Sequence, residues 1–201
     1  QVGKGFFEMV GGTLTALNGG MFYTTNTESE FVLSNVEIIP SEDNDYFLRC
    51  TGNSNQRGWG TSGANGAVCT FTGIGQDMVG NVIWDSISQL DLYLTSGSLL
   101  TGAVIDDEAN AGDGGDGYAS LYIDATSAWV VTGDSVLTNL YSEGSVRDAD
   151  GNAVSIIGTD GTVYVQGTSA YTVTVSAYSG QCDLSGAGGT DSWSDYQVSF
   201  K

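Results

Sequence analysis

Apolar and polar residues alternate along most of this chain, in short runs that small or turn-forming residues interrupt. Alternation with a period of two predicts strands with one buried face. The runs are rich in Val, Ile, Leu, Tyr and Thr, which suit a pleated sheet. No stretch keeps an apolar period of 3.6 residues over three turns, and the chain has a single Pro. We therefore expect an all-β protein with almost no helix.

The strand pattern repeats along the chain. Segment 121–132 aligns without a gap with segment 163–174, 42 positions later. Segment 92–102 gives a third copy if two residues are deleted, and segments 7–14 and 31–38 are fainter copies 24 positions apart. Recurrence of this kind indicates one supersecondary unit stacked on itself. In such a stack, Trp129 and its counterpart Tyr171 are expected to pack in adjacent coils.

Loops of unequal length separate the repeats, at 51–68, 106–118 and 142–152. Without these loops the coils have about 20–25 residues, which is within the range of solenoid repeats. An antiparallel sandwich is the alternative, but it does not require the same side chains to recur in register. We expect a right-handed parallel β-helix, or β-solenoid, over residues 1–178. A Gly/Ser-rich tail at 179–201 follows, with an alternating pattern around Trp193 and Tyr196 that predicts a last strand.

Several short motifs follow one another in a characteristic order, at 18–27, 47–49, 58–60, 85–92 and 129–134. Their order resembles that of the β-helical, pectate-lyase-like surface and adhesin proteins of Gram-positive anaerobic bacteria, over roughly residues 7–175. The resemblance implies a right-handed β-helix that is secreted or lies on the cell surface, in a group often without a proven enzyme activity. It also implies that further coils could precede residue 1.

The charge of the chain is strongly acidic, with 24 Asp and Glu against 5 Lys and Arg and a net charge of −19. Nucleic acids and anionic membranes are bound through Lys and Arg, so we expect neither as a partner. The first residues are too polar for a signal peptide or a membrane span, and we expect no membrane insertion. Low Lys content with abundant Thr, Ser, Asn and Gly is common in secreted proteins. We therefore expect an extracellular or cell-surface location.

Two of the three cysteines flank the longest loop. A disulfide between Cys50 and Cys69 would close the neck of loop 51–68, and closing a loop of about 15 residues stabilises a fold by roughly 3 kcal/mol in the entropic description. The alternative is a pair of buried thiols that simply pack. Cys182 lies in the tail, where it either links chains or remains free.

Two acidic loops are candidates for binding Ca²⁺, which prefers six to eight oxygen ligands. The second loop has the alternating oxygens that open an EF-hand, but Thr159 stands where the closing acidic residue belongs. The alternative is a pair of solvated turns, in which Asp, Asn and Gly are the usual residues. The candidate ligands are Asp106, Asp107, Glu108, Asp113 and Asp116 in the first loop, and Asp148, Asp150 and Asn152 in the second.

Residues for catalysis are scarce, because the chain has no His to act as acid or base. Arg49 is expected to be a surface contact or a loop brace, and a paired-carboxylate glycosidase is the remaining enzymatic alternative. We expect no enzyme activity. Aromatic rings stack on sugars, so Trp59 with Arg57, Tyr46 and Asn55 forms a candidate carbohydrate patch. The alternative is that Trp59 folds back over the end of a coil.

These observations together predict a non-enzymatic β-solenoid that serves as a structural or adhesive module. One version is a fibre built by end stacking or strand donation, because the chain opens on the apolar segment 5–10 and carries a spare strand in its tail. The other version is a module that binds polysaccharide. A polysaccharide lyase or hydrolase is the third alternative.

Overall fold

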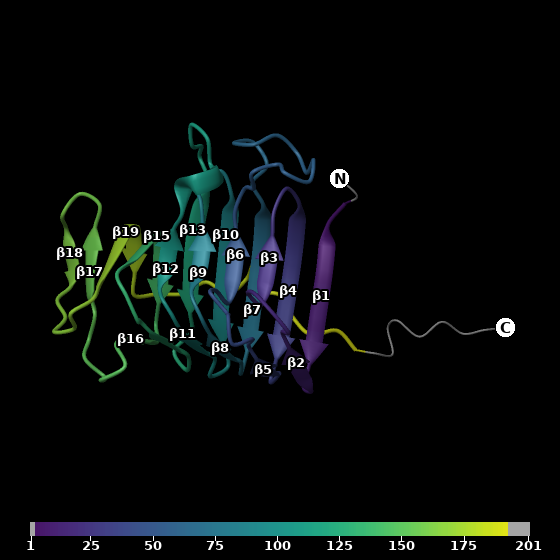
Figure 1. Cartoon of the computed structure of the whole chain (residues 1–201). Coiled ribbons are helices and arrows are strands. Elements are labelled where there is room, and N and C mark those ends of the chain that lie inside the picture. The colour runs from purple at the N-terminus through teal and green to yellow at the C-terminus, as the bar shows by residue number, and fades with distance from the viewer. Residues whose placement is uncertain (1–2, 193–201) are drawn as a thin grey trace.

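The computed structural model describes residues 3–192, and its regular structure is almost entirely β (Figure 1). The single helical element among these residues is the 3₁₀ turn η1 (Glu108–Asn110). No helix in this part of the chain is long and apolar enough to cross a membrane. The prediction of an all-β chain is confirmed.

The first sheet has nine strands, and all its neighbouring strands are parallel except the last pair, β17 and β18. Its order across the sheet differs from the order in sequence, because β19 lies between β15 and β17. The strands in spatial order are β1 (Gly5–Val10), β4 (Glu28–Ser34), β7 (Val68–Ile74), β10 (Gln89–Thr95), β13 (Tyr118–Ile123), β15 (Ser135–Ser142), β19 (Thr172–Ser179), β17 (Ser155–Gly158) and β18 (Val163–Val165).

Shorter strands form a second and a third set, also parallel. In the second set one sheet holds β2 (Thr13–Thr15) and β5 (Glu37–Ile39), and another holds β8 (Asp77–Val79), β11 (Leu99–Thr101), β14 (Ala128–Val130) and β16 (Ser145–Arg147). The third sheet holds β3 (Phe22–Thr24), β6 (Leu48–Cys50), β9 (Val82–Trp84) and β12 (Val104–Asp106).

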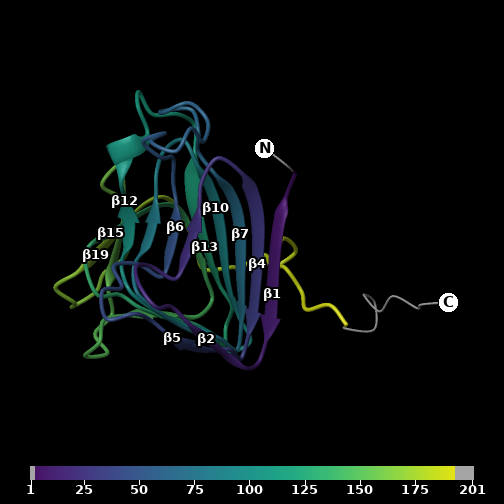
Figure 2. The same cartoon turned by 45° about the vertical axis from the view of Figure 1, so that its right-hand side comes forward.

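The chain visits the three sets in turn, and it does so four times between β1 and β12 (Figures 1 and 2). Each strand of the first and third sets pairs with the strand at the same place in the next round. An antiparallel sandwich is therefore excluded for these rounds, because their neighbouring strands run in the same direction.

The strand register confirms two of the sequence repeats. Phe7 pairs with Phe31, which is the spacing of 24 positions seen in the sequence. Leu92 pairs with Leu121 and Leu99 pairs with Ala128, so both strands of this copy are offset by 29 positions. The two-residue deletion inferred from the sequence is therefore wrong, because the turn between the two strands has the same length in both rounds.

A left-handed residue ends the first-sheet strand in each of the first four rounds. The residues that follow β1, β4, β7 and β10 are Gly11, Asn35, Gly75 and Ser96. Their φ angles are 63°, 52°, 57° and 58°, respectively. Gly and Asn adopt this conformation most readily. It turns the chain from the first sheet into the second, so these corners are encoded locally.

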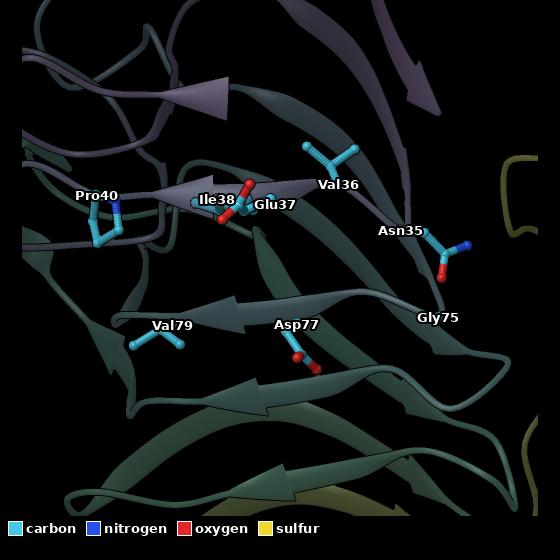
Figure 3. A pocket seen from close by; sticks show the side chains of 8 residues that line it. All are labelled: Asn35, Val36, Glu37, Ile38, Pro40, Gly75, Asp77 and Val79. Carbon is cyan, nitrogen blue, oxygen red and sulfur yellow. The ribbon is translucent and has the colours of Figure 1, made fainter. Parts of the chain in front are cut away.

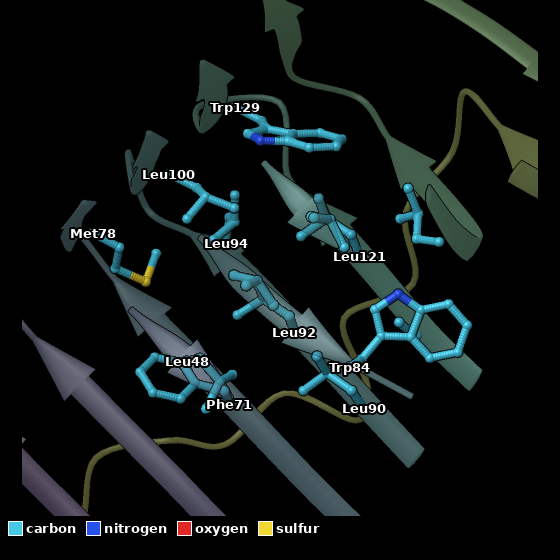
Figure 4. Close-up of a cluster of buried hydrophobic side chains, with 14 of the residues drawn as sticks. Leu48, Phe71, Met78, Trp84, Leu90, Leu92, Leu94, Leu100, Leu121 and Trp129 are labelled. Carbon is cyan, nitrogen blue, oxygen red and sulfur yellow. The ribbon is translucent and has the colours of Figure 1, made fainter. Parts of the chain in front are cut away.

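The inward-facing side chains of all three sets form one hydrophobic core (Figure 4). Phe71, Leu92 and Leu121 stack in register from the first sheet. Met78, Leu100 and Trp129 do the same from the second set. Trp129 is fully buried and donates its Nε1–H to the carbonyl of Gly102 at 2.9 Å.

The copy at 163–174 does not occupy the place that the sequence predicts. Its first part is β18, which pairs antiparallel with β17, and its second part enters β19. Tyr171 is 37% exposed, so the expected packing of Trp129 and Tyr171 in adjacent coils is wrong. The physical reason is that the chain leaves the regular rounds after β16, and β19 returns to pair with β15.

After β19 the chain runs back across the outer face of the first sheet and reaches β1, as Figures 1 and 2 show in yellow. We call residues 180–192 the strap. The strand predicted around Trp193 and Tyr196 lies outside the described residues.

Candidate functional site

Two of the non-repeating loops meet at one end of the strands, where the chain returns from the third sheet to the first (Figure 1). Loop 51–67 follows β6, and loop 107–117 follows β12. They touch at Gly63 and Gly112, where an added Cβ on Gly63 would stand 3.1 Å from the Gly112 Cα. Segment 85–88 supports both loops, because Asp85 accepts the Gly52 N–H at 2.6 Å and Glu108 accepts the Ser86 N–H at 2.6 Å.

Two asparagine side chains hold the longer loop in shape. Asn65 is buried and donates from its amide to the carbonyls of Asn53 at 2.9 Å and Trp59 at 3.1 Å. Asn53 donates to the same Trp59 carbonyl at 3.3 Å and to the Thr25 hydroxyl at 2.8 Å. The backbone at Trp59 is therefore fixed by two amides.

An aromatic hollow of about 310 Å³ opens beside this loop. Trp59 is 50% exposed and the Arg57 guanidinium carbon lies 5.8 Å from its ring centroid. Tyr23, on β3, is 45% exposed and lines the same hollow. Asn53, Ser54 and Gln56 complete its wall with amide and hydroxyl groups. Trp59 thus stays at the surface, as one of the two sequence interpretations expects.

Of the four residues in the predicted carbohydrate patch, two line the hollow and two lie elsewhere. Trp59 and Arg57 line the hollow together. Asn55 has a left-handed φ of 57° and takes part in the turn, where its N–H donates to Asn53 Oδ1 at 2.8 Å. Tyr46 instead packs against Arg49, whose guanidinium carbon lies 5.5 Å from the tyrosine ring centroid.

Sequence reasoning missed Tyr23 as part of this site. The signal was present, since Tyr23 stands between Phe22 and Thr24, which are both buried, and alternation therefore points its ring outward. Arg49 is its register neighbour on β6. Arg49 forms an ion pair with Asp107 at 2.9 Å and so braces loop 107–117, one of the two roles expected for it.

The carboxylates of the first acidic loop have separate environments. Partial burial and a hydrogen bond with Glu108 raise the pKa of Asp106 to about 6. Burial opposes ionisation of Glu108, but hydrogen bonds from Ser86 and Asp106 outweigh it and lower the Glu108 pKa. Asp107 is engaged with Arg49, while Asp113 and Asp116 are exposed.

The second acidic loop is built around one carboxylate. Asp148 Oδ1 accepts the N–H groups of Asp150 at 3.0 Å and Asn152 at 2.8 Å, and Oδ2 accepts the Asn152 amide at 3.1 Å. Within residues 3–192, no group of three or more His, Cys, Asp or Glu side chains has the arrangement of a metal site. Calcium binding at either loop stays a prediction.

Cys50 and Cys69 lie together beneath the neck of loop 51–67, where both are buried. They are present as thiols, and hydrogen bonding to Cys69 together with burial raises the pKa of Cys50 well above its usual value. The two thiols are therefore neighbours, and a disulfide between them stays a prediction. Cys182 is a partly buried thiol in the strap.

A second hollow, of about 570 Å³, lies on the second set between β5 and β8 (Figure 3). The two sheets of this set are joined there by Gln76, whose buried amide accepts the Val36 N–H and donates to the Val36 carbonyl, both at 2.8 Å. The wall contains the carboxylates of Glu37 and Asp77 but no aromatic ring. The hollow beside Trp59 therefore offers the better surface for a ligand.

Comparison of the chain with protein-family models, with curated proteins and with solved structures gave no match. The resemblance to β-helical surface proteins therefore rests on the sequence motifs alone.

Proposed function

We propose that this protein is a secreted or cell-surface, non-enzymatic adhesive module that binds polysaccharide. Its scaffold is proposed to be a right-handed parallel β-helix formed by the successive rounds of three strands. The handedness is supported by a general rule, since connections between parallel strands of one sheet are right-handed in about 98% of cases.

The observation that carries the proposal is the aromatic hollow at Tyr23, Arg57 and Trp59. Tyr23 and Trp59 present half-exposed rings at a hollow whose size is at the lower end of small-ligand pockets. The amide of Gln56 and the hydroxyl of Ser54 supply donors and acceptors for sugar hydroxyls. Rigid aromatic surface combined with a few polar groups is the chemistry that a sugar ring requires.

The charge of the chain selects among polysaccharides. A net charge of −19 repels polyanions over long distances, and among the described residues Arg57 is the only cation that lines the hollow. A neutral polysaccharide is therefore the proposed ligand class.

Affinity electrophoresis in gels containing neutral polysaccharides tests this function. We expect Trp59→Ala and Tyr23→Ala each to weaken retardation at least tenfold, since each removes one ring. Tyr164→Ala is the matched control, because Tyr164 is 39% exposed on β18, at the other end of the first sheet. The proposal is wrong if the wild-type chain is not retarded by any neutral glycan, or if Trp59→Ala binds as well as the wild type.

Fibre assembly is the second candidate, and the observation that favours it is the apolar edge at β1. Phe6 is 52% exposed and Phe7 is 37% exposed there. Electron microscopy of purified protein tests this version, because filaments support it and dispersed single particles contradict it. The lyase or hydrolase alternative has less support, since Asp106 and Glu108 are in direct hydrogen-bond contact, closer than the roughly 5 Å or more that glycosidases need.

A further inference from the structure

The second set of strands is divided at one place, between β5 and β8, which we call the seam. In the first sheet the strands of the same two rounds pair directly, with Ser34 opposite Ile74. Two residues further on, the side chain of Gln76 takes the place of the ladder, because its amide bonds to both backbone groups of Val36. Among the described strands, β5 then pairs only with β2 and β8 only with β11. The hollow of about 570 Å³ lies along this seam (Figure 3).

Backbone groups of both strands face the seam without a strand to pair with. Successive residues of a strand direct their N–H and C=O groups to opposite sides. The Glu37 N–H and the Ile39 C=O are bonded on the side of β2, at 2.9 and 3.0 Å, so Ile38 between them faces β8. By the same alternation Asp77 and Val79 face β5, because the residues on either side of them bond toward β11. The seam therefore has two facing strand edges, and such edges accept further hydrogen bonds.

The walls of the hollow combine two carboxylates with apolar surface. Glu37 and Asp77 are 40 positions apart, the same offset that Gln76 bridges, and both are exposed. Their carboxylates therefore stand on the outer face, on either side of the seam (Figure 3). Ile38 and Val79 line the same hollow, and Val79 is 56% exposed. Like charges at facing positions repel each other, so these two carboxylates oppose closure of the seam.

Within the described part of the chain, no cation is paired with either carboxylate. Glu37 accepts the Thr13 hydroxyl at 2.9 Å, and the ion pairs within residues 3–192 join Lys4 and Arg49 to other acidic residues. Arg57 lies over an aromatic ring. The chain has only five Lys and Arg, and three of them are engaged in these contacts. A second copy of the chain is therefore a poor source of the positive charge that the seam lacks.

The side chain of an arginine has the chemistry that these surroundings require. Its planar guanidinium carries five N–H donors, which carboxylates and backbone carbonyls accept, and it is less strongly hydrated than an ammonium group. Its aliphatic stem packs on apolar surface, which Ile38 and Val79 provide. An extended backbone beside it can bond to the free strand edges of the seam. The net charge of −19 also attracts a basic partner over long distances.

We propose that the seam between β5 and β8 is a docking site for a basic, extended segment of another protein, which places an Arg side chain between Glu37 and Asp77. The stem of this Arg lies against Ile38 and Val79. The interaction is independent of polysaccharide binding, because the hollow beside Trp59 is lined by a different set of residues.

Fluorescence anisotropy at 150 mM NaCl, with a labelled peptide of alternating Arg and Val, tests the proposal. We expect the wild-type chain to bind this peptide at least tenfold more tightly than a peptide with citrulline at each Arg, because citrulline keeps the shape and lacks the charge. The double variant Glu37→Gln, Asp77→Asn is expected to bind the Arg peptide at least tenfold more weakly. The double variant Glu42→Gln, Asp45→Asn makes the same change of charge on exposed side chains outside the hollow, and we expect it to lose less than twofold.

Hydrogen exchange locates the bound peptide on the chain. We expect the peptide to slow exchange in segments 36–40 and 77–79 and to leave β13, at the middle of the first sheet, unchanged. Exchange in β13 also reports whether either double variant has unfolded as a whole.

Four outcomes overturn the proposal. The first two are that the wild-type chain does not bind the Arg peptide, or that it binds the citrulline peptide equally well. The third is an equal loss of affinity in the two double variants, which means that the peptide is held by diffuse attraction to a negative chain. The fourth is slower exchange only outside the seam, which means that the peptide binds elsewhere.

Discussion

At the scale of single residues, this fold depends on buried polar side chains that replace missing backbone partners. Gln76 joins β5 to β8 by two hydrogen bonds to one residue, and Asn65 holds the loop that carries Trp59. Asp85 is fully buried and accepts the Gly52 N–H; burial raises its pKa, against the effect of hydrogen bonds from Ser88 and Gly52. These groups are costly to bury unless they are paired, so each marks a position where the chain departs from its regular rounds.

The pair Asp106 and Glu108 gives a pH dependence at this scale. The Asp106 pKa is raised to about 6 in the fold, so the folded state binds this proton more tightly than the unfolded chain does. The contribution of this protonation to the free energy of unfolding is fully present at a pH below the usual pKa of Asp. It is lost as the pH rises through about 6. The lowered pKa of Glu108 acts in the opposite direction and at lower pH.

We therefore expect Asp106→Asn to flatten the loss of stability between pH 4 and pH 6. The amide of the new Asn side chain stays neutral and still donates to Glu108. The variant therefore becomes more stable relative to the wild type as the pH rises to 7. Urea unfolding at pH 4, 5, 6 and 7 measures this difference. Asp113→Asn, an exposed carboxylate in the same loop, is the control, and an identical slope for wild type and Asp106→Asn contradicts the prediction.

At the scale of elements, the strap differs from every strand because small residues let it lie flat on the sheet. Segment 180–192 contains four glycines, at 180, 186, 188 and 189. A Cβ on Gly188 would come within 2.7 Å of Val32 and 3.0 Å of Glu30. A Cβ on Gly189 would have no atom within 4 Å.

The two neighbouring glycines make a matched pair for a test of the strap. We expect Gly188→Val to lift the strap from Thr72 and Val32, so that limited proteolysis between residues 180 and 192 becomes at least several-fold faster. Gly189→Val adds the same side chain with space around it and is expected to be cleaved like the wild type. Equal cleavage of the two variants contradicts a strap held by close contact at Gly188.

At the scale of the whole molecule, the dominant feature is the charge of −19 on a chain of 201 residues. Within residues 3–192 the ion pairs are those of Lys4 with Glu28 and Glu30 and of Arg49 with Asp107. Most of the carboxylates are therefore not neutralised by a neighbouring cation. Self-repulsion of this kind opposes the compact state and is screened by salt.

We expect the melting temperature to rise by several degrees between 10 and 300 mM NaCl, because the Debye length falls from about 30 Å to less than 10 Å over this range. Tetramethylammonium chloride at equal ionic strength is expected to have the same effect. A constant or falling melting temperature contradicts the prediction. A larger rise in CaCl₂ at matched ionic strength would support the predicted calcium sites, and no extra rise would count against them.

Much of the fold could be predicted from local sequence patterns, but the candidate site could be predicted only in part. Alternation predicted the strands, and the 24-residue spacing predicted the pairing of Phe7 with Phe31, because neighbouring rounds are nearly equal in length. Trp59 was identified from its exposed loop, whereas Tyr23 was missed because the hollow that both residues line is formed by different rounds of the chain. Tyr171 was misplaced because β19 inserts out of order, which no local signal reveals.

Local pattern and composition are enough to specify the strands, the left-handed corners at Gly11, Asn35 and Gly75, and the strong negative charge. These properties depend on side-chain alternation, on the φ that a residue tolerates and on composition, all of which are local or additive. The meeting of loops 51–67 and 107–117, and the course of the strap across the first sheet to Glu8, follow only from the folding of the whole chain. Both arise from the register of parallel strands, which brings together residues that are far apart in the chain.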